Sequence, residues 1–170
     1  IKQTMDTTAT KIFETIAERI QGQGITIIAK DEQRPWGGFL VLDENDAEKF
    51  IELYFPGYNK NQVAQGNKLS PKVLMVAPGK RLSWQYHLRR AELWSVIDGP
   101  IGVGSSDTNE QKHINVYQPG AVINLPNGSR HRLIGLDNWG IVAEIWVHTD
   151  ATHPSDEDDI IRLQDDFGRN

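Results

Sequence analysis

The chain has no cysteine, which excludes disulfides, thiolate metal sites and a cysteine nucleophile. It has no apolar run near the roughly 18 residues of a membrane-spanning helix, and its start lacks the apolar core of a signal peptide. Its net charge of -5 shows no basic excess, which argues against nucleic acid or an anionic membrane as the main partner. We therefore expect a cytoplasmic protein in which histidine, carboxylate or amide groups hold any metal.

The 170 residues, of which 38% are hydrophobic and 24% charged, predict one globular domain spanning residues 1–170. An amphipathic helix is expected over residues 7–21, because its apolar residues recur at helical spacing and Gly22 and Gly24 follow. These apolar residues are Ile12, Phe13, Ile16, Ala17 and Ile20. The chain is thus expected to open with a single helix.

After this helix, short apolar runs with a period of two predict an all-β sandwich, jelly roll or barrel. The predicted strands are 25–29, 39–42, 49–55, 72–77, 82–87, 93–97, 113–117, 121–125, 131–135 and 141–147. Turn residues such as Pro78-Gly79 and Asn127-Gly128 separate them. The polar, aperiodic stretch 56–71 predicts a long loop, and a flap over a site is one interpretation of it.

The stretch "QYHLRRAE" (85–92) places three potential metal ligands within eight residues. Because residues two apart on a strand share a face, Gln85 and His87 can face one ion together. Glu92 begins the next strand, and pairing of the two strands would bring its carboxylate to the same interior. His131 is the best candidate for a fourth ligand. The set of Gln85, His87, Glu92 and His131 suits zinc and would also accept Mn, Fe, Co or Ni.

The spacing of these residues resembles the two sequence motifs of the cupin superfamily. The first motif is Gly, five residues, His-x-His, three or four residues, Glu, six residues and Gly. The second is Gly, five residues, Pro-x-Gly, two residues, His, three residues and Asn. This chain keeps every spacing, with Gln85 in place of the first histidine and Gly135 in place of the asparagine. The matching positions are Gly79, Gln85, His87, Glu92 and Gly99, then Gly120, Pro126, Gly128, His131 and Gly135.

A narrower resemblance is to the cupin domain of type II phosphomannose isomerases, and it covers residues 34–169. The shared segments are "RPWG" (34–37), "LSWQYHLRRAELW" (82–94), "RHRL" (130–133) and "EDDIIRLQDDFGR" (157–169). Members of this family also carry glutamine at the position of Gln85. Relatives carry extra histidines where this chain has Leu88 and Arg89, so this pair is where the resemblance fails.

The resemblance implies a cupin double-stranded β-helix, which is a jelly-roll barrel, with the N-terminal helix outside. It implies a mannose-6-phosphate isomerase that uses one divalent metal ion, and a homodimer is expected by analogy. Two alternatives stay open: a non-catalytic sugar-binding cupin, and an isomerase of an unphosphorylated sugar such as mannose or lyxose. No nucleic acid or membrane partner is expected.

Two further groups of residues are candidates for substrate chemistry. Glu144 and His148 share one face of the last long strand, and either is a candidate general acid or base. Four arginines lie near the predicted ligands and are candidates to bind a substrate phosphate. They are Arg81, Arg89, Arg90 and Arg130, of which Arg81 shares strand parity with Gln85 and His87.

Overall fold

The computed structural model describes residues 2–64 and 67–169, and most of its regular structure is antiparallel β-sheet. A six-stranded sheet has the order β1-β2-β3-β10-β5-β8, and a five-stranded sheet has the order β11-β4-β9-β6-β7. The first sheet contains β1 (Ile27–Arg34), β2 (Gly37–Leu42), β3 (Lys72–Val76), β10 (Gly140–His148), β5 (Arg90–Asp98) and β8 (Val122–Leu125). The second contains β11 (Ile161–Gln164), β4 (Trp84–Tyr86), β9 (Arg130–Gly135), β6 (Ile101–Ser106) and β7 (His113–Tyr117).

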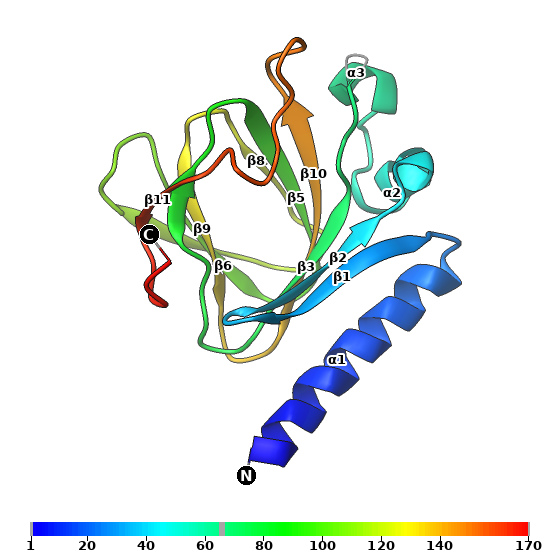
Figure 1. The fold of residues 1–170 in the computed structure, drawn as a ribbon, viewed down its shortest axis with the longest axis vertical. Helices are drawn as coiled ribbons and strands as arrows, with labels where there is room; N and C mark the ends of the chain where they lie inside the picture. Colours follow the sequence, from blue (N-terminus) through cyan, green and yellow to red (C-terminus); the bar gives the residue numbers. More distant parts are fainter. Residues whose placement is uncertain (1, 65–66, 170) are drawn as a thin grey trace.

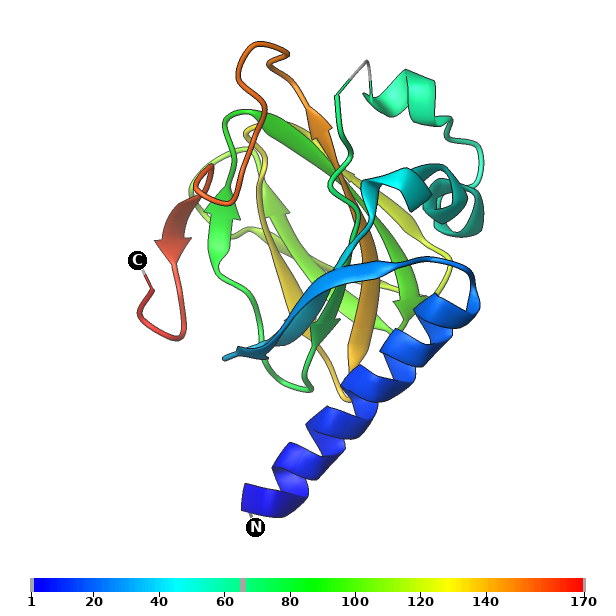
Figure 2. The same cartoon turned by 45° about the vertical axis from the view of Figure 1, so that its right-hand side comes forward.

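The two sheets face one another and enclose the barrel interior, as the views in Figures 1 and 2 show. One apolar cluster fills the closed part of this interior, and it includes Trp94, Val96, Val103, Leu133 and Val142. The polar residues of the site lie beyond this cluster. The barrel is therefore a packed core at one end and a polar cavity at the other.

A second apolar cluster lies on the outer face of the six-stranded sheet, where helices cover it. Helix α1 (Lys2–Gly22) contributes Phe13, Ile16 and Ile20, and helix α2 (Ala47–Tyr54) contributes Phe50 and Ile51. The central strand β3 is buried at all five positions because both of its faces are covered. Figure 1 shows α1 running along the outside of the barrel beside β1 and β2. These features confirm the predicted all-β barrel with an N-terminal helix.

The strand predicted at 49–55 is wrong, because this segment belongs to helix α2. The residues that α2 buries are Ala47, Phe50 and Ile51, with Tyr54 half-buried, and these positions have the spacing of one helical face. The side chain of Asp43 accepts a hydrogen bond from the Asn45 N–H and caps the short 3-10 helix Glu44–Asp46 that precedes α2. The buried residues Phe50 and Ile51 of "KFIELYF" therefore belong to one face of a helix that begins at Ala47, before this stretch.

Strands β6 and β11 were not predicted. β6 contains Gly102 and Gly104, which weaken a strand signal, yet a Cβ at Gly102 would lie only 3.2 Å from the Ile134 side chain. The predicted loop 56–71 contains the short helix α3 (Lys60–Ala64). Residues 65–66 of this loop lie outside the described residues, and none of the described ones lines the cavity of the site.

The close approach of two chain segments explains why the second cupin-like motif ends in glycine. A Cβ at Gly135 would collide with the backbone carbonyl of Ala77, and its backbone N–H donates to the Lys80 carbonyl at 2.7 Å. An asparagine cannot occupy this position without moving the β3–β4 connection. Separately, none of the helices described here is both long enough and apolar enough to span a membrane.

Candidate metal centre

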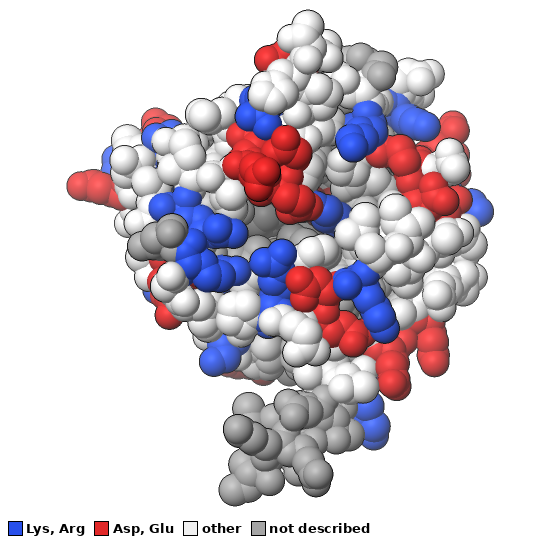
Figure 3. Space-filling view, viewed as in Figure 1, with Lys and Arg blue, Asp and Glu red and all other residues white. Residues whose placement is uncertain are grey.

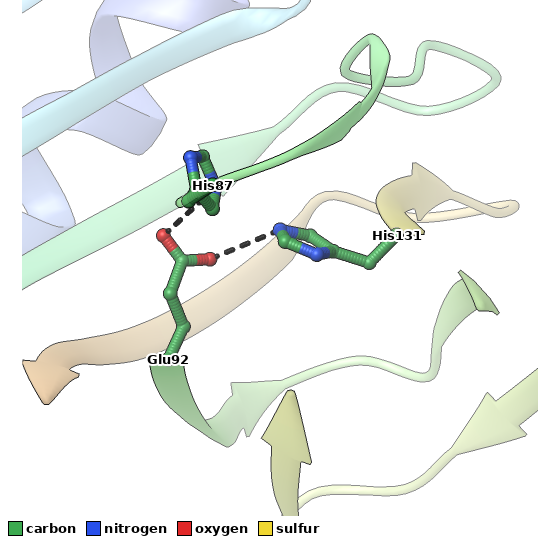
Figure 4. Close-up of side chains that lie close together, drawn as sticks. All are labelled: His87, Glu92 and His131. Carbon is green, nitrogen blue, oxygen red and sulfur yellow. Dashed lines mark ion pairs between the residues drawn. The ribbon is translucent and has the colours of Figure 1, made fainter. Parts of the chain in front are cut away.

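Three side chains from different strands converge inside the barrel. His87 directly follows β4, Glu92 lies on β5 and His131 lies on β9, and Figure 4 shows the three pointing toward one another. Glu92 Oε2 lies 3.4 Å from His87 Nε2, and Glu92 Oε1 lies 3.1 Å from His131 Nε2. One ligand atom from each residue lies within 4.8 Å of the others, and all three residues are buried. The expected pairing of β4 with β5 is wrong, because the two strands belong to different sheets. Glu92 reaches the two histidines because its sheet faces the sheet that contains β4 and β9.

Backbone carbonyls fix the orientation of both imidazoles. His87 Nδ1 donates to the Asp159 carbonyl oxygen at 2.7 Å, and His131 Nδ1 donates to the Ser129 carbonyl oxygen at 3.0 Å. A carbonyl oxygen only accepts hydrogen bonds, so each Nδ1 carries the hydrogen and each neutral ring keeps a lone pair on Nε2. Burial lowers the pKa of His87 to about 4, so this ring is neutral at physiological pH.

Glu92 faces these two lone pairs as a carboxylate. Burial acts to raise the pKa of Glu92, but the positive charge that His87 carries when protonated and the permanent charge of the Arg90 guanidinium outweigh it and hold that pKa well below its usual value. Glu92 Oε1 and His131 Nε2 are buried and have no hydrogen-bond partner. A carboxylate and two imidazole lone pairs facing one another need a cation, so the donor set fits a divalent metal ion. The same donors suit Zn, Mn, Fe, Co or Ni.

Gln85 lies on β4, the strand that pairs with the His131 strand β9. It pairs in register with His131 across β4 and β9, and it lines the same cavity as Glu92. Its Oε1 accepts a hydrogen bond from the Ser83 hydroxyl at 2.6 Å. Residues paired in register present their side chains on the same face of a sheet. Gln85 is thus placed to add an amide oxygen to the ligand group.

Of the four arginines predicted to bind substrate, Arg90 alone lines the cavity. Its Nε donates to Glu92 Oε2 at 3.0 Å, and its Nη1 donates to the Ser155 hydroxyl at 3.0 Å. Its guanidinium stacks on the Trp146 ring, with 3.7 Å from Cζ to the ring centroid. Arg90 therefore holds the Glu92 carboxylate in place from the side away from His131.

The structure places the other three arginines away from the cavity, which corrects the strand-parity argument for Arg81. Arg81 makes a two-point ion pair with Asp166, at 2.7 Å and 2.9 Å, near the surface. It forms only an isolated bridge with Ile134, and β4 begins at Trp84, so the alternation of a continuous strand does not extend back to it. Arg89 pairs with Asp156, and Arg130 stacks on the Tyr86 ring.

Glu144 of β10 is buried and lines the cavity together with Glu92. Trp94 Nε1 donates to its Oε2 at 2.9 Å, and Trp146 Nε1 donates to its Oε1 at 3.1 Å. Burial, with a smaller contribution from the Glu92 charge, raises the pKa of Glu144 to about 7. A carboxyl with such a pKa can give or take a proton near neutral pH.

His148, the other predicted acid or base, lies at the end of β10 and does not line the cavity. Its Nδ1 accepts the Ser155 backbone N–H at 2.9 Å, so in the neutral ring the hydrogen is on Nε2. Burial lowers its pKa. The structure thus separates the two candidates, and only Glu144 faces the cavity.

Four basic residues that the sequence analysis did not assign to the site also line the cavity: Arg34, Lys72, Arg162 and Arg169. Lys72 lies over the Trp146 ring, 3.8 Å from its centroid, and pairs with Glu157. Figure 3 shows a hollow on this face, with basic side chains gathered along part of its edge and acidic ones along another part. Arg34 and the two tail arginines belong to the segments "RPWG" and "EDDIIRLQDDFGR". The resemblance of these two segments to the isomerase family was the sequence signal that could have assigned these arginines to the site.

The sequence model of the family described as "Mannose-6-phosphate isomerase C-terminal" matches residues 43–165, which include all four candidate ligands. The chain belongs to this mannose-6-phosphate isomerase C-terminal family. The resemblance noted from the sequence motifs is thereby confirmed.

Relatives with this domain are longer proteins. The alginate biosynthesis protein AlgA of Pseudomonas aeruginosa is 30% identical over 162 residues, which cover 94% of this chain and 30% of AlgA. A mannose-1-phosphate guanylyltransferase of Salmonella montevideo is 27% identical over 119 residues, which cover 70% of this chain and 24% of that protein. The chain therefore spans less than a third of the length of these relatives.

Solved structures of cupin proteins share the fold of this family member at low sequence identity. Oxalate decarboxylase OxdC of Bacillus subtilis superposes with a TM-score of 0.56 and 14% identity, covering 79% of this chain and 30% of that one. The capsular polysaccharide assembling protein CapF of Staphylococcus aureus gives a TM-score of 0.51 and 17% identity, covering 82% of this chain and 34% of that one. These likenesses show the cupin fold alone.

Proposed function

We propose that this protein is a metal-dependent aldose–ketose isomerase that interconverts mannose 6-phosphate and fructose 6-phosphate. The observation that carries the proposal is the position of Glu144. This buried carboxyl has its pKa raised to about 7 and lines the same cavity as Glu92, which belongs to the His87, Glu92 and His131 group. The isomerisation needs a proton moved between C1 and C2 of the open-chain sugar through an enediol(ate), and Glu144 is the group suited to move it.

The metal ligands and Glu144 have separate tasks in this proposal. A divalent ion held by Gln85, His87, Glu92 and His131 would polarise the sugar carbonyl and stabilise the oxyanion that develops. Glu144 would take the proton from one carbon and return it to the other. The indole N–H groups of Trp94 and Trp146 each bind one oxygen of Glu144, so its carboxylate cannot rotate away from the cavity.

Two further observations support this function over the sugar-binding alternative. The family description names mannose-6-phosphate isomerase, which supports the substrate. The pair Leu88-Arg89, where the chain departs from its relatives, lies outside the cavity lining: Leu88 is 58% exposed and Arg89 pairs with Asp156. The loss of histidines at these two positions therefore leaves the proposed catalytic groups intact.

The proposal is tested by incubating the metal-loaded protein with mannose 6-phosphate in deuterated water and following the sugar by NMR. Conversion to fructose 6-phosphate is expected. Deuterium should enter C1 of the product to the extent that the proton held by Glu144 exchanges with solvent before it is returned. Chelation should abolish conversion, and added metal should restore it. The Glu144→Gln variant should lose conversion, whereas Glu52→Gln, on the exposed face of α2, should keep it.

Two outcomes would contradict the proposal. A metal-loaded protein that binds sugars but neither converts nor deuterates any phosphosugar is a binding protein, not an isomerase. Equal turnover of mannose and mannose 6-phosphate would instead identify an isomerase of unphosphorylated sugars.

A further inference from the structure

Three arginines from distant parts of the chain line one side of the cavity. Arg34 is the last residue of β1, Arg162 lies on β11, and Arg169 follows β11. They line the same cavity as Gln85 and Glu92, so they share a solvent space with the metal centre. None of the three was assigned to the site from the sequence.

Strand pairing places Arg162 next to the proposed metal ligands. Arg162 pairs in register with Gln85 across β11 and β4, and Gln85 pairs in register with His131 across β4 and β9. Directly paired residues in an antiparallel sheet have Cβ atoms about 4.5–5.5 Å apart and side chains on the same face. Arg162, Gln85 and His131 therefore form one row across the interior face of this sheet.

The charges of the three guanidinium groups are not fully balanced by the protein. Arg169 is held by two bonds to Asp165, at 2.8 Å and 2.9 Å, and Arg34 pairs with Asp31 at 3.0 Å. Among the ion pairs of the described residues, none involves Arg162 and a carboxylate. Its Nη1 reaches only the backbone carbonyl of Arg169, at 3.4 Å, and its Nε is buried without a partner.

Among the described residues, Arg162 thus has no carboxylate paired with it, and the nearby charges are mostly positive. Burial, and after it the charge of Arg169, lowers the pKa of Arg162, while Asp165 opposes this change. Arg34 acts in the same direction as Arg169. A buried donor without a partner normally finds one in a ligand or a bound water. The planar fork of a guanidinium matches the oxygens of a phosphate group.

We propose that Arg162, flanked by Arg34 and Arg169, binds the phosphate monoester of the substrate while the sugar carbonyl reaches the metal centre. This inference rests on the proposed isomerase function and names the groups that select phosphorylated sugars. The exposed acidic residues Asp156 and Glu157, with Glu157 at the cavity edge, disfavour a phosphate on their side. The phosphate is therefore directed toward the arginines.

Binding is tested first, by ³¹P NMR titration of the metal-loaded protein with mannose 6-phosphate and, separately, with inorganic phosphate. Wild-type protein should bind mannose 6-phosphate, and inorganic phosphate should compete for the same place. Arg162→Gln should weaken both by about ten-fold to a hundred-fold, the range expected for losing charge-assisted hydrogen bonds. Arg162→Lys keeps the charge without the fork and should recover part of the loss.

The control is Arg19→Gln, which removes an exposed arginine that pairs with Asp98 far from the cavity. This variant should bind both ligands as the wild type does. Thermal unfolding of each variant shows whether Arg162→Gln still folds, and Arg34→Gln, which leaves the β11–β4 pairing intact, provides a second measurement. Binding of inorganic phosphate without binding of mannose 6-phosphate would overturn the proposal.

Kinetics separate this inference from the proposed function. If Arg162→Gln raises KM for mannose 6-phosphate about ten-fold or more and leaves any turnover of unphosphorylated mannose unchanged, the phosphate site is supported. If wild type turns over mannose 6-phosphate and Arg162→Gln leaves KM unchanged, the phosphate site is wrong although the isomerase stands. If mannose 6-phosphate binds through Arg162 but no variant or wild type converts it, the isomerase fails and the phosphate site stands.

Discussion

His87 Nδ1 donates a 2.7 Å hydrogen bond to the backbone carbonyl of Asp159, a residue 72 positions further along the chain. The Asp159 carboxylate in turn accepts the backbone N–H groups of Leu88 and Arg89, both at 2.9 Å. It also accepts the Ser155 hydroxyl at 2.6 Å. One residue of the C-terminal segment thus fixes both the ring of a candidate metal ligand and the chain that follows it.

Asp159→Ala keeps the backbone carbonyl that binds His87 but removes the carboxylate that holds this carbonyl in place. It is therefore expected to weaken metal binding about ten-fold, the lower end of the effect of losing a partner that orients a metal ligand. Without the carboxylate, the segment carrying the His87 hydrogen bond is no longer tied to Leu88 and Arg89. Calorimetric titration with Zn²⁺ or Co²⁺ measures the affinity. Asp159→Asn keeps one carbonyl acceptor and should lose less, and Asp158→Ala, at an exposed neighbouring position, should bind metal normally. Unchanged affinity in Asp159→Ala would refute this role.

The protein is expected to bind one divalent ion per chain, through the group containing Glu92 and His131. Elemental analysis after dialysis gives the stoichiometry. At an ion concentration of a hundred times Kd, the folded state should gain about 2.7 kcal/mol, seen as a higher unfolding midpoint. His131→Gln should lose both effects, whereas His113→Gln, on the exposed strand β7, should keep them. Equal binding by the two variants would place the ion elsewhere.

Glu144 should make the stability of the metal-free protein depend on pH. Its pKa is raised from the ordinary 4.5 to about 7, so the folded state holds the proton more tightly than the unfolded chain. The stabilising contribution is therefore complete below pH 4.5 and is lost as the pH rises through about 7. Urea unfolding of wild type and Glu144→Gln, both chelated, should show wild type losing stability relative to the variant between pH 5 and pH 8. A constant difference would contradict the raised pKa.

Arg81 should matter little for catalysis, although strand parity made it the first candidate for binding phosphate. Its ion pair with Asp166 is about a third exposed, and such surface pairs contribute only about 0–1 kcal/mol. Arg81→Gln should leave KM for mannose 6-phosphate within about two-fold of wild type and change the unfolding free energy by less than about 1 kcal/mol. A large rise in KM would restore the original prediction.

The sequence predicted the barrel and identified the candidate ligands that the structure brings together, because both depend on local signals. Alternating apolar residues mark the strands. The motif spacing of Gln85, His87 and Glu92 identifies the segment that runs from β4 into β5. The error at α2 arose because the alternating residues 49–55 were considered without Ala47, which completes the helical face. Strand β6 was missed because its glycines are needed for packing against β9 and give no apolar pattern.

The arginines of the cavity could not be predicted from local pattern. Arg162 becomes a neighbour of Gln85 only through the pairing of β11 with β4, and no local rule fixes which edge a short strand of four residues joins. Arg34 reaches the cavity only through the fold of the six-stranded sheet. Arg81 was predicted to bind phosphate because it has the same strand parity as Gln85. Parity fixes the face of a residue only within a continuous strand, and β4 begins after Arg81.

Docking of the C-terminal segment and binding of a metal ion are expected to be coupled equilibria. β11 has four residues and in its sheet pairs only with β4, so it can detach at lower free energy than the central strand β10. Since Asp159 orients His87, any factor by which docking raises metal affinity is also the factor by which the ion favours docking. Adding the ion should therefore slow amide hydrogen exchange at Leu88 and Arg89 more than in β10. A bound ion would thus stabilise the docking of the C-terminal segment against the barrel.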